Sequence, residues 1–412
     1  MIQKIIYPHK QSIKNNFNCL DPLLALRGFA CLAVVVLHCN PPRNSLIYKG
    51  YDLTWIIFPS GGVAVWIFFC LSGYLMGKAF YTERYSIDVS GVLNFWRNRI
   101  LKIFPLYYFS SLILALFVYP EIFKIENWGY LARILTFTYN HSLPVGVNGV
   151  LWSLATEVQF YVCVPFIYTC LKAHLFKRKQ IVLAFGAIIF FVFILKLISW
   201  ISFYPQFRTN GSYLVKYWYA PLIMNLDIFL CGFLVNPWLK YKKPTPDEPA
   251  IIKTHQSIFT RLSSKTLAVL LFLALYVFTC HYQYHIKLLT STSFFILQPL
   301  TALITSFFII SFESDAYQEF YLNEKLSFAS ILKNPIRILE IFGNLSYGVY
   351  IWHESIIEKL APIFTSDIPI EAFYTRLTAT LIFSTLLAAV TYYLVEIPAR
   401  RWKIYRQSET GK

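Results

Sequence analysis

The feature that most constrains the fold is a series of apolar stretches, each close to the length that crosses a lipid bilayer. A transmembrane helix needs roughly 20 consecutive apolar residues. Ten such stretches follow one another along the chain: 23–40, 56–77, 100–119, 150–171, 181–203, 214–236, 267–284, 291–312, 338–357 and 374–396. Because lipid leaves an open strand edge without hydrogen-bond partners, each stretch is expected to be a helix. The sequence predicts an all-α polytopic membrane protein with about ten transmembrane helices.

Composition favours the same environment. The chain is 57% hydrophobic and only 14% charged, whereas a soluble domain has about 25% charged residues. Its eight cysteines form no CxxC pair. Those within the spans are expected to behave as small apolar residues, and no disulfide is expected.

The basic residues predict the orientation in the membrane. Ten spans place both termini on one side, and 27 of the 37 lysines and arginines fall on that side, with 8 on the other. The positive-inside rule therefore predicts that both termini are cytoplasmic. Most of the basic residues behind the net charge of +16 are then expected to set the membrane topology and to contact anionic lipid head groups. Because this charge is spread over six cytoplasmic segments, no nucleic-acid partner is expected.

The chain is expected to form one membrane domain at 23–398, with a short cytoplasmic lead at 1–22 and a cytoplasmic tail at 399–412. The first span has no small-x-small cleavage site, so it is expected to be retained rather than removed as a signal peptide. Residues 239–265 are the most loop-like segment, since they are polar and rich in proline. We expect some amphipathic helix within 311–335, and an external link at 120–149 that could cover a site.

Two polar residues stand out in the first span. Arg27 and His38 are 11 residues apart, which brings them to within roughly 20° of each other on a helix surface, about 16 Å apart along its axis. Polar residues within a span usually face the protein interior and mark a site. The alternative is that Arg27 is a snorkelling anchor and His38 an interfacial residue.

A carboxylate in the fourth span forms part of a second polar face. Ser153, Glu157 and Tyr161 recur every four positions and so lie on one side of a helix. A carboxylate within a membrane is costly unless it is paired. A histidine or arginine is the expected partner of Glu157, and the alternative role is a structural ion pair.

The ninth span carries a third polar face. Ser346, Tyr350 and His353 follow one another at spacings of four and three, and Tyr347 stands next to Ser346. Because this span is expected to run outward, His353 should lie at a depth similar to that of His38.

Basic groups gather at the opposite, cytoplasmic end. Arg97, Arg99 and Lys102 open the third span, and Ser72, Gly73 and Tyr74 end the second. Clustered Arg and Lys side chains suit phosphate binding; the alternative is that they serve topology alone. Together with His38, Glu157 and His353 further out, they form a two-ended layout. Acyl-CoA has a matching shape, with a phosphorylated nucleotide, a neutral pantetheine arm and a reactive thioester.

Six segments in this order resemble the membrane acyltransferase-3 family, which O-acetylates bacterial surface polysaccharides and related acceptors. They are LRGFACLAVVVLH with its R-x10-H spacing, FFCLSGYLM, RNRILKIFPLYY, LWSLATEVQFY, GNLSYGVYIWH and VEIPARRW, and they extend from residue 26 to residue 402. Two departures concern Lys102, where the family usually has a second arginine, and Val158, where it often has a second acid. The first keeps the charge but loses the bidentate geometry of arginine.

The resemblance implies that Arg27 and His38 are functional, with His38 as the catalytic base, and it implies an O-acetyltransferase in a bacterial inner membrane. The acyl donor would be acetyl-CoA, without a permanently bound cofactor or metal, and the acceptor a glycan or glycolipid such as lipopolysaccharide O-antigen. The expected site residues are His38, Glu157 and His353 for catalysis; Arg27, Arg99, Lys102, Ser72 and Tyr74 for the donor; and Trp152, Ser153, Tyr161, Ser346 and Tyr347 in support.

Three other functions fit parts of the sequence. A secondary transporter or flippase would use the same intramembrane charges, but no paired repeat is evident. A purely structural membrane protein would not need Arg27 and His38 aligned. His281 and His285 have an i, i+4 spacing that can bind zinc, without an evident third ligand.

Overall fold

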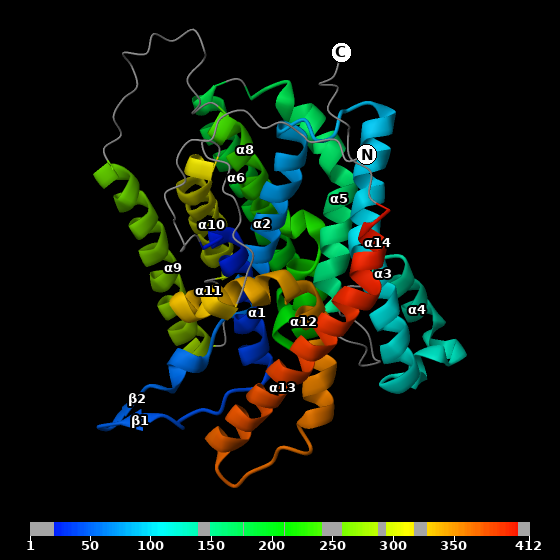
Figure 1. The fold of residues 1–412 in the computed structure, drawn as a ribbon, viewed down its shortest axis with the longest axis vertical. Helices are drawn as coiled ribbons and strands as arrows, with labels where there is room; N and C mark the ends of the chain where they lie inside the picture. Colours follow the sequence, from blue (N-terminus) through cyan, green and yellow to red (C-terminus); the bar gives the residue numbers. More distant parts are fainter. Residues whose placement is uncertain are drawn as a thin grey trace.

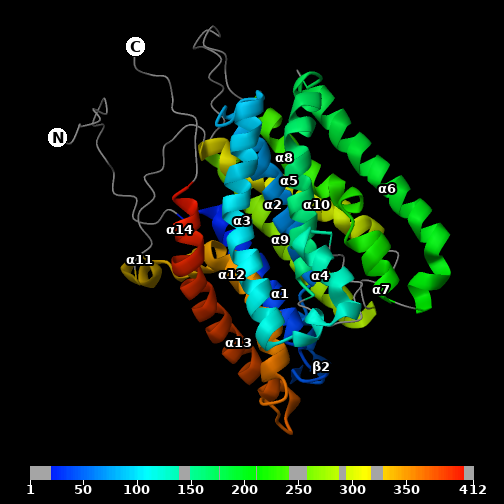
Figure 2. The ribbon, with the colours of Figure 1, turned by 90° about the vertical axis from the view of Figure 1, so that its right-hand side faces the viewer.

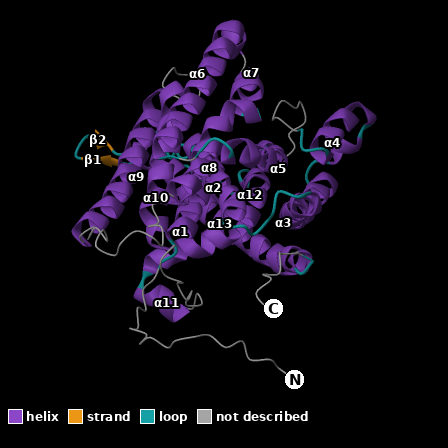
Figure 3. Ribbon diagram, turned by 90° about the horizontal axis from the view of Figure 1, so that it is seen from above, coloured by secondary structure: helices purple, strands orange, loops and turns teal. Residues whose placement is uncertain are grey.

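The fold is almost entirely helical (Figures 1 and 3). A computed structural model describes residues 20–138, 149–175, 177–209, 211–240, 258–286, 294–316 and 328–402. Within these ranges the strands are β1 (Ile47–Tyr48) and β2 (Tyr51–Asp52), which pair as one antiparallel hairpin. The predicted all-α fold is confirmed.

Ten long helices overlap the ten predicted spans. They are α1 (Pro22–His38), α2 (Gly61–Tyr81), α3 (Val89–Phe117), α5 (Leu151–Lys172), α6 (Arg178–Thr209), α8 (Leu226–Lys240), α9 (Ile258–Ile286), α10 (Phe294–Ala316), α12 (Ile338–Leu360) and α13 (Pro369–Thr391). Shorter helices are α4 (Trp128–Leu135), α7 (Gly211–Leu214), α11 (Phe328–Lys333) and α14 (Ile397–Arg400), and π-helical turns occur at Val215–Tyr219 and Tyr392–Glu396.

Several predicted boundaries are wrong. The predicted span 214–236 is not one helix, because a π-helical turn and Pro221 interrupt it and α8 begins only at Leu226. Helix α9 begins at Ile258, inside the predicted loop 239–265. The remaining parts of that loop at 241–257, and residues 1–19, 139–148, 317–327 and 403–412, lie outside the described residues.

Eight helices of the described chain are long and apolar enough to cross a membrane. Helix α1 is apolar but has only 17 residues, and α12 falls outside this group because polar residues such as Glu340, His353 and Glu354 interrupt its sequence. The chain is therefore a multi-pass membrane protein by the character of its helices. The count of ten spans, the cytoplasmic termini and the domain boundaries stay predictions.

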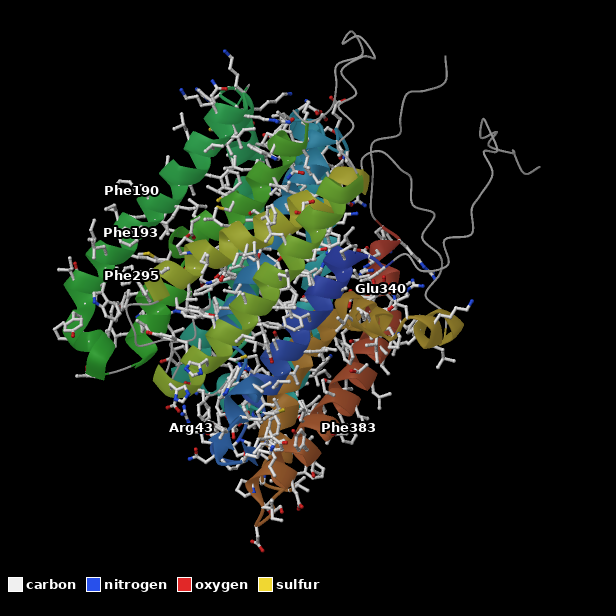
Figure 4. The ribbon with its side chains drawn as sticks, turned by 90° about the vertical axis from the view of Figure 1, so that its left-hand side faces the viewer. Arg43, Phe190, Phe193, Phe295, Glu340 and Phe383 are labelled. Atoms are coloured by element: carbon white, nitrogen blue, oxygen red, sulfur yellow. The ribbon has the colours of Figure 1, made fainter. Side chains whose placement is uncertain are left out.

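Helix α2 lies at the centre of the bundle and α6 at its edge (Figure 2). Of the most apolar part of each helix, 83% is buried in α2 but only 17% in α6. The labelled Phe190 on α6 and Phe383 on α13 lie on opposite flanks (Figure 4), and both side chains are exposed. Exposed phenylalanines on these helices are what a lipid-facing surface requires.

Two parallel helix pairs pack with their backbones in contact. In the α1–α12 pair, a Cβ added to Gly28 would clash with the Leu339 carbonyl, and one added to Gly343 would clash with that of Leu24. In the α2–α8 pair, Gly73 meets the Phe229 carbonyl in the same way. Small residues at membrane helix interfaces allow this close approach, which fixes the helices that carry the polar faces.

The β-hairpin is joined to one end of α9 by hydrogen bonds. Tyr284 at the end of α9 donates a hydrogen bond to Asp52, and Thr54 donates to the same carboxylate. These hydrogen bonds lower the pKa of Asp52, and the one from Thr54 has the larger effect. The hairpin itself projects, with Tyr51 74% exposed.

Candidate functional site

A cavity of about 80 Å³ lies among α1, α2, α3, α5 and α12. This volume is several times the roughly 10–15 Å³ that one water needs. Eight of the predicted site residues line it: Arg27, Ser72, Lys102, Ser153, Glu157, Tyr161, Ser346 and Tyr347. Polar residues predicted separately on five spans thus meet in one place.

Hydroxyl groups, rather than a histidine or arginine, are the hydrogen-bond partners of Glu157. Ser72 Oγ donates to Glu157 Oε1 at 2.6 Å, and the Tyr161 hydroxyl donates to the same oxygen. The two hydroxyl oxygens are 2.8 Å apart. The expected pairing of Glu157 with a cation is therefore wrong, and the carboxylate instead ties α2 to α5.

Among the described residues, neither Arg27 nor Lys102 of the cavity wall forms an ion pair with a carboxylate. Arg27 Nη2 donates to Ser346 Oγ at 3.3 Å, while its Nε is buried without a partner in the described part of the chain. Lys102 lies in the cavity wall, where the charges of Arg27 and Arg99 act on it together with that of Glu157. The cavity is lined by two positively charged side chains, Arg27 and Lys102, and one negatively charged side chain, Glu157. This excess of positive charge favours an anionic ligand.

His38 and His353 form a hydrogen-bonded pair. His353 Nε2 lies 2.9 Å from His38 Nδ1, and His353 Nδ1 lies 2.8 Å from the Tyr350 carbonyl oxygen. Because a carbonyl only accepts, His353 Nδ1 carries a hydrogen. Neutral His353 then accepts at Nε2, so His38 donates from Nδ1 and has its lone pair on Nε2. The geometry leaves His38 Nε2 as the basic atom.

The histidine pair lies one layer beyond the cavity wall. Tyr350 connects the two, since it lines the cavity, its hydroxyl is 2.7 Å from Ser153 Oγ, and its carbonyl binds His353. Arg27 and His38 both contact α12, as expected of residues on one face of α1. Arg27 lines the cavity, but His38 reaches it only through its neighbours.

Besides the two histidines, three predicted site residues lie outside the cavity wall. Tyr74 is fully buried, and its hydroxyl donates to Glu313 at 2.5 Å; its donor-binding role stays a prediction. Trp152 packs with its ring 4.7 Å from that of Tyr219. Arg99 sits behind the wall, with Nη1 3.7 Å from Met76 Sδ.

A fourth cation near this end was missed by the sequence analysis. The charge of Arg400 also acts on Lys102, and its segment VEIPARRW had been noted only as a motif. The regular helical spacing of polar residues did not predict which way Arg400 points, because a π-helical turn at Tyr392–Glu396 precedes it.

The alternative zinc site lacks ligands. The rings of His281 and His285 lie 4.3 Å apart at the end of α9, and His281 packs against Trp55. Across the residues that the structure describes, no group of three or more His, Cys, Asp or Glu side chains could hold a metal ion.

Comparison with known proteins identifies the family. A family model described as an acyltransferase domain matches residues 20–395. O-acetyltransferase OatA of Staphylococcus aureus (strain NCTC 8325 / PS 47) is 25% identical over 401 residues, which cover 93% of this chain and 57% of OatA. A putative O-acetyltransferase of S. aureus (strain COL), SACOL0978, is 24% identical over 91% of this chain and 56% of its own length.

This chain thus spans a little over half the length of these relatives. No solved structure matches it. The family model covers most of the chain and agrees with the motif resemblance. The chain therefore belongs to the membrane acyltransferase-3 family.

Proposed function

We propose that this protein is an O-acyltransferase that moves an acetyl group from cytoplasmic acetyl-CoA to a hydroxyl of a cell-surface glycan, such as lipopolysaccharide O-antigen, at a bacterial inner membrane. The observation that carries the proposal is the arrangement of the cavity. Arg27 and Lys102, which form no ion pair within the described part of the chain, line the cavity, and a histidine pair lies one layer beyond its wall. The names of the relatives agree with this chemistry.

The cationic end suits the nucleotide of the donor. Arg27 and Lys102 line the cavity, and the charge of Arg99, behind its wall, acts on Lys102. Guanidinium and ammonium groups of this kind bind phosphate through charge-assisted hydrogen bonds. An ion pair with protein carboxylates would have indicated a structural role. Without such a pair, the phosphates of CoA supply the missing negative charge.

The pantetheine arm would run along the cavity toward the histidines. Arg27 and His38 are 11 positions apart on α1, or about 16 Å along a helix axis. A donor held by its phosphates near Arg27 therefore places its thioester well away from its charged end. The apolar side chains of Val65, Phe68 and Phe69 line this path and suit a neutral arm.

His38 would act as the general base. Its Nε2 accepts the proton of the acceptor hydroxyl while the hydroxyl oxygen attacks the thioester carbonyl carbon. When the carbon–sulfur bond breaks, the same proton passes from Nε2 to the departing CoA thiolate. The ester and free CoA are the products, and the histidine returns to its neutral form.

Replacing His38 tests the proposal. We expect His38→Ala to lower transfer by about 10²–10⁴-fold, the range of general-base catalysis. Transfer is measured as labelled acetate moving from acetyl-CoA to glycan in membranes, together with acetyl-sized mass differences on surface glycans.

His281→Ala is the matched control, because its ring lies at the end of α9 beside Trp55 rather than at the cavity. The control should keep wild-type transfer, and both variants should insert in the membrane. Full transfer by His38→Ala would refute the assignment of the base. Glycans that are identical with and without the gene would instead favour a transporter or flippase.

A further inference from the structure

The end of α13 changes which side of the helix is buried. Its buried residues Thr380, Ser384, Ala388 and Thr391 follow one another at spacings of four, four and three. The next buried residue is Glu396, five positions after Thr391. The Ile397 N–H bonds to the Tyr392 carbonyl, which is the i to i+5 pattern of a π-helix. The extra residue puts Glu396 on the buried face in place of Val395.

Arg400 follows Glu396 by one helical turn and so shares its direction. Its Nη2 donates to Glu396 Oε2 at 2.6 Å, and its Nη1 lies 3.3 Å from the Tyr392 hydroxyl. The guanidinium carbon is 5.0 Å from the centre of the Tyr392 ring. These contacts hold the guanidinium in one orientation, while 32% of the side chain remains exposed.

Helix α14, which carries Arg400, packs against α3, which carries Arg99 and Lys102, in both views (Figures 1 and 2). Arg27 and Lys102 line the cavity, whereas Arg99 and Arg400 lie outside its wall. The charges of Arg27, Arg99 and Arg400 all act on Lys102. The cations of α1, α3 and α14 therefore belong to one electrostatic neighbourhood beside the cavity.

These cations also have unused donors. The Nε atoms of Arg27, Arg99 and Arg400 are each buried without a hydrogen-bond partner among the described residues. A buried N–H without an acceptor is unfavourable, but these Nε atoms are covered by protein, so a ligand would bind through the Nη groups instead. Glu396 and Tyr392 engage two of the five guanidinium donors of Arg400, and its Nε–H is buried. The two remaining Nη–H donors can bind phosphate.

We propose that Arg400 is a donor-binding residue, which contacts a phosphate of the CoA nucleotide and completes a four-cation site with Arg27, Arg99 and Lys102. Glu396 is then a positioning residue that aims the guanidinium. This proposal rests on the proposed acyltransferase function and adds to it the residue that closes the donor site.

The experiment compares two adjacent arginines in the full chain, purified in detergent. Arg401→Ala is the matched control for Arg400→Ala, because Arg401 is exposed and carries the same charge. Binding of acetyl-CoA and of S-acetylpantetheine, which lacks every phosphate, is measured by titration calorimetry. We expect Arg400→Ala to weaken acetyl-CoA binding about tenfold or more, as loss of a charge-assisted contact would, and to leave S-acetylpantetheine binding unchanged.

The possible results separate this proposal from the proposed function. If Arg400→Ala binds acetyl-CoA as tightly as wild type, Arg400 is not a donor-binding residue, although the acyltransferase proposal stands. An equal loss for both ligands would also overturn the assignment, since the effect would then be on folding or on the whole cavity. If the wild-type protein binds no CoA, both proposals fail.

Discussion

His353 determines which nitrogen of His38 can act as a base. Its Nε2 accepts from His38 Nδ1, and the Tyr350 carbonyl holds His353 itself. We therefore expect His353→Ala to lower kcat by about 10²-fold or more, because His38 loses the partner that fixes its tautomer and stabilises its protonated form. The KM for acetyl-CoA should stay the same, since His353 lies outside the cationic end. Steady-state kinetics of glycan acetylation measures both quantities.

His353→Gln provides the comparison for this prediction. The amide oxygen of glutamine can accept from His38 Nδ1, so this variant should retain more activity than His353→Ala. If the two variants were equally slow, a direct contact of His353 with the acceptor would explain the loss better than a positioning role.

Periodicity in the sequence predicted much of the cavity at this scale. The i, i+4 spacing of Ser153, Glu157 and Tyr161 placed them on one face, and all three line the cavity. The partners of Glu157 could not be predicted, because they depend on how α2 lies against α5. A carboxylate that accepts from two hydroxyls has the same sequence signature as one that pairs with arginine.

At the scale of helices, the contact between α2 and α8 depends on Gly73. A Cβ at this position would collide with the Phe229 carbonyl oxygen, which is backbone and cannot move aside alone. We expect Gly73→Ala to push the helices apart and to destabilise the protein by about 1–3 kcal/mol or more, as overpacking does. Thermal unfolding in detergent measures the change as a lower Tm.

The matched control is Gly186→Ala on α6. A Cβ at Gly186 meets nothing within 4 Å, and alanine favours helix over glycine. This variant should be as stable as wild type or slightly more so. A Gly73→Ala protein with an unchanged Tm would mean that the two helices can separate at no cost.

Hydropathy predicted where helices occur but not where they begin. Helix α3 starts at Val89 rather than near 100, since the helix continues through polar residues beyond the apolar section. The π-helical turns at Val215–Tyr219 and Tyr392–Glu396 are also invisible to a fixed period of 3.6 residues. Each adds one residue to the turn and so shifts the buried face by one position, which is why spacing did not predict that Arg400 and Glu396 point the same way.

At the scale of the whole molecule, the predicted topology places the β-hairpin and α14 on opposite sides of the membrane. Nine predicted spans separate Tyr51 from Arg401, and both side chains are exposed. In a Cys170→Ser background, which removes an exposed native thiol, we expect Tyr51→Cys to react with an impermeant maleimide applied to intact cells. Arg401→Cys should react only after the membrane is opened.

Labelling of both positions from the same side would contradict the odd number of crossings. It would also put the cationic end and the projecting hairpin in one compartment, so that donor and acceptor would arrive from the same solution.

The architecture could be predicted from the sequence more fully than the site. Each of the ten apolar stretches overlaps a helix of the described chain, although several helices begin elsewhere and the stretch 214–236 is broken. This overlap could be predicted because the length and composition of a stretch are local properties. The cavity arises from contacts between segments far apart in the chain, such as that of Arg27 on α1 with Ser346 on α12, 319 positions later. From the sequence, only the resemblance to a family predicted that these distant segments contribute to one site.

The long separation of the two histidines also governs when the protein becomes competent during its synthesis. His38 is made early, and its partner follows 315 residues later. The groove on α1 that Gly28 opens for α12 must stay vacant in the bilayer, or be shielded by other factors, while the ribosome makes the intervening helices. A nascent chain arrested before α12 would contain His38 but not His353, so the hydrogen-bonded histidine pair could not form in it.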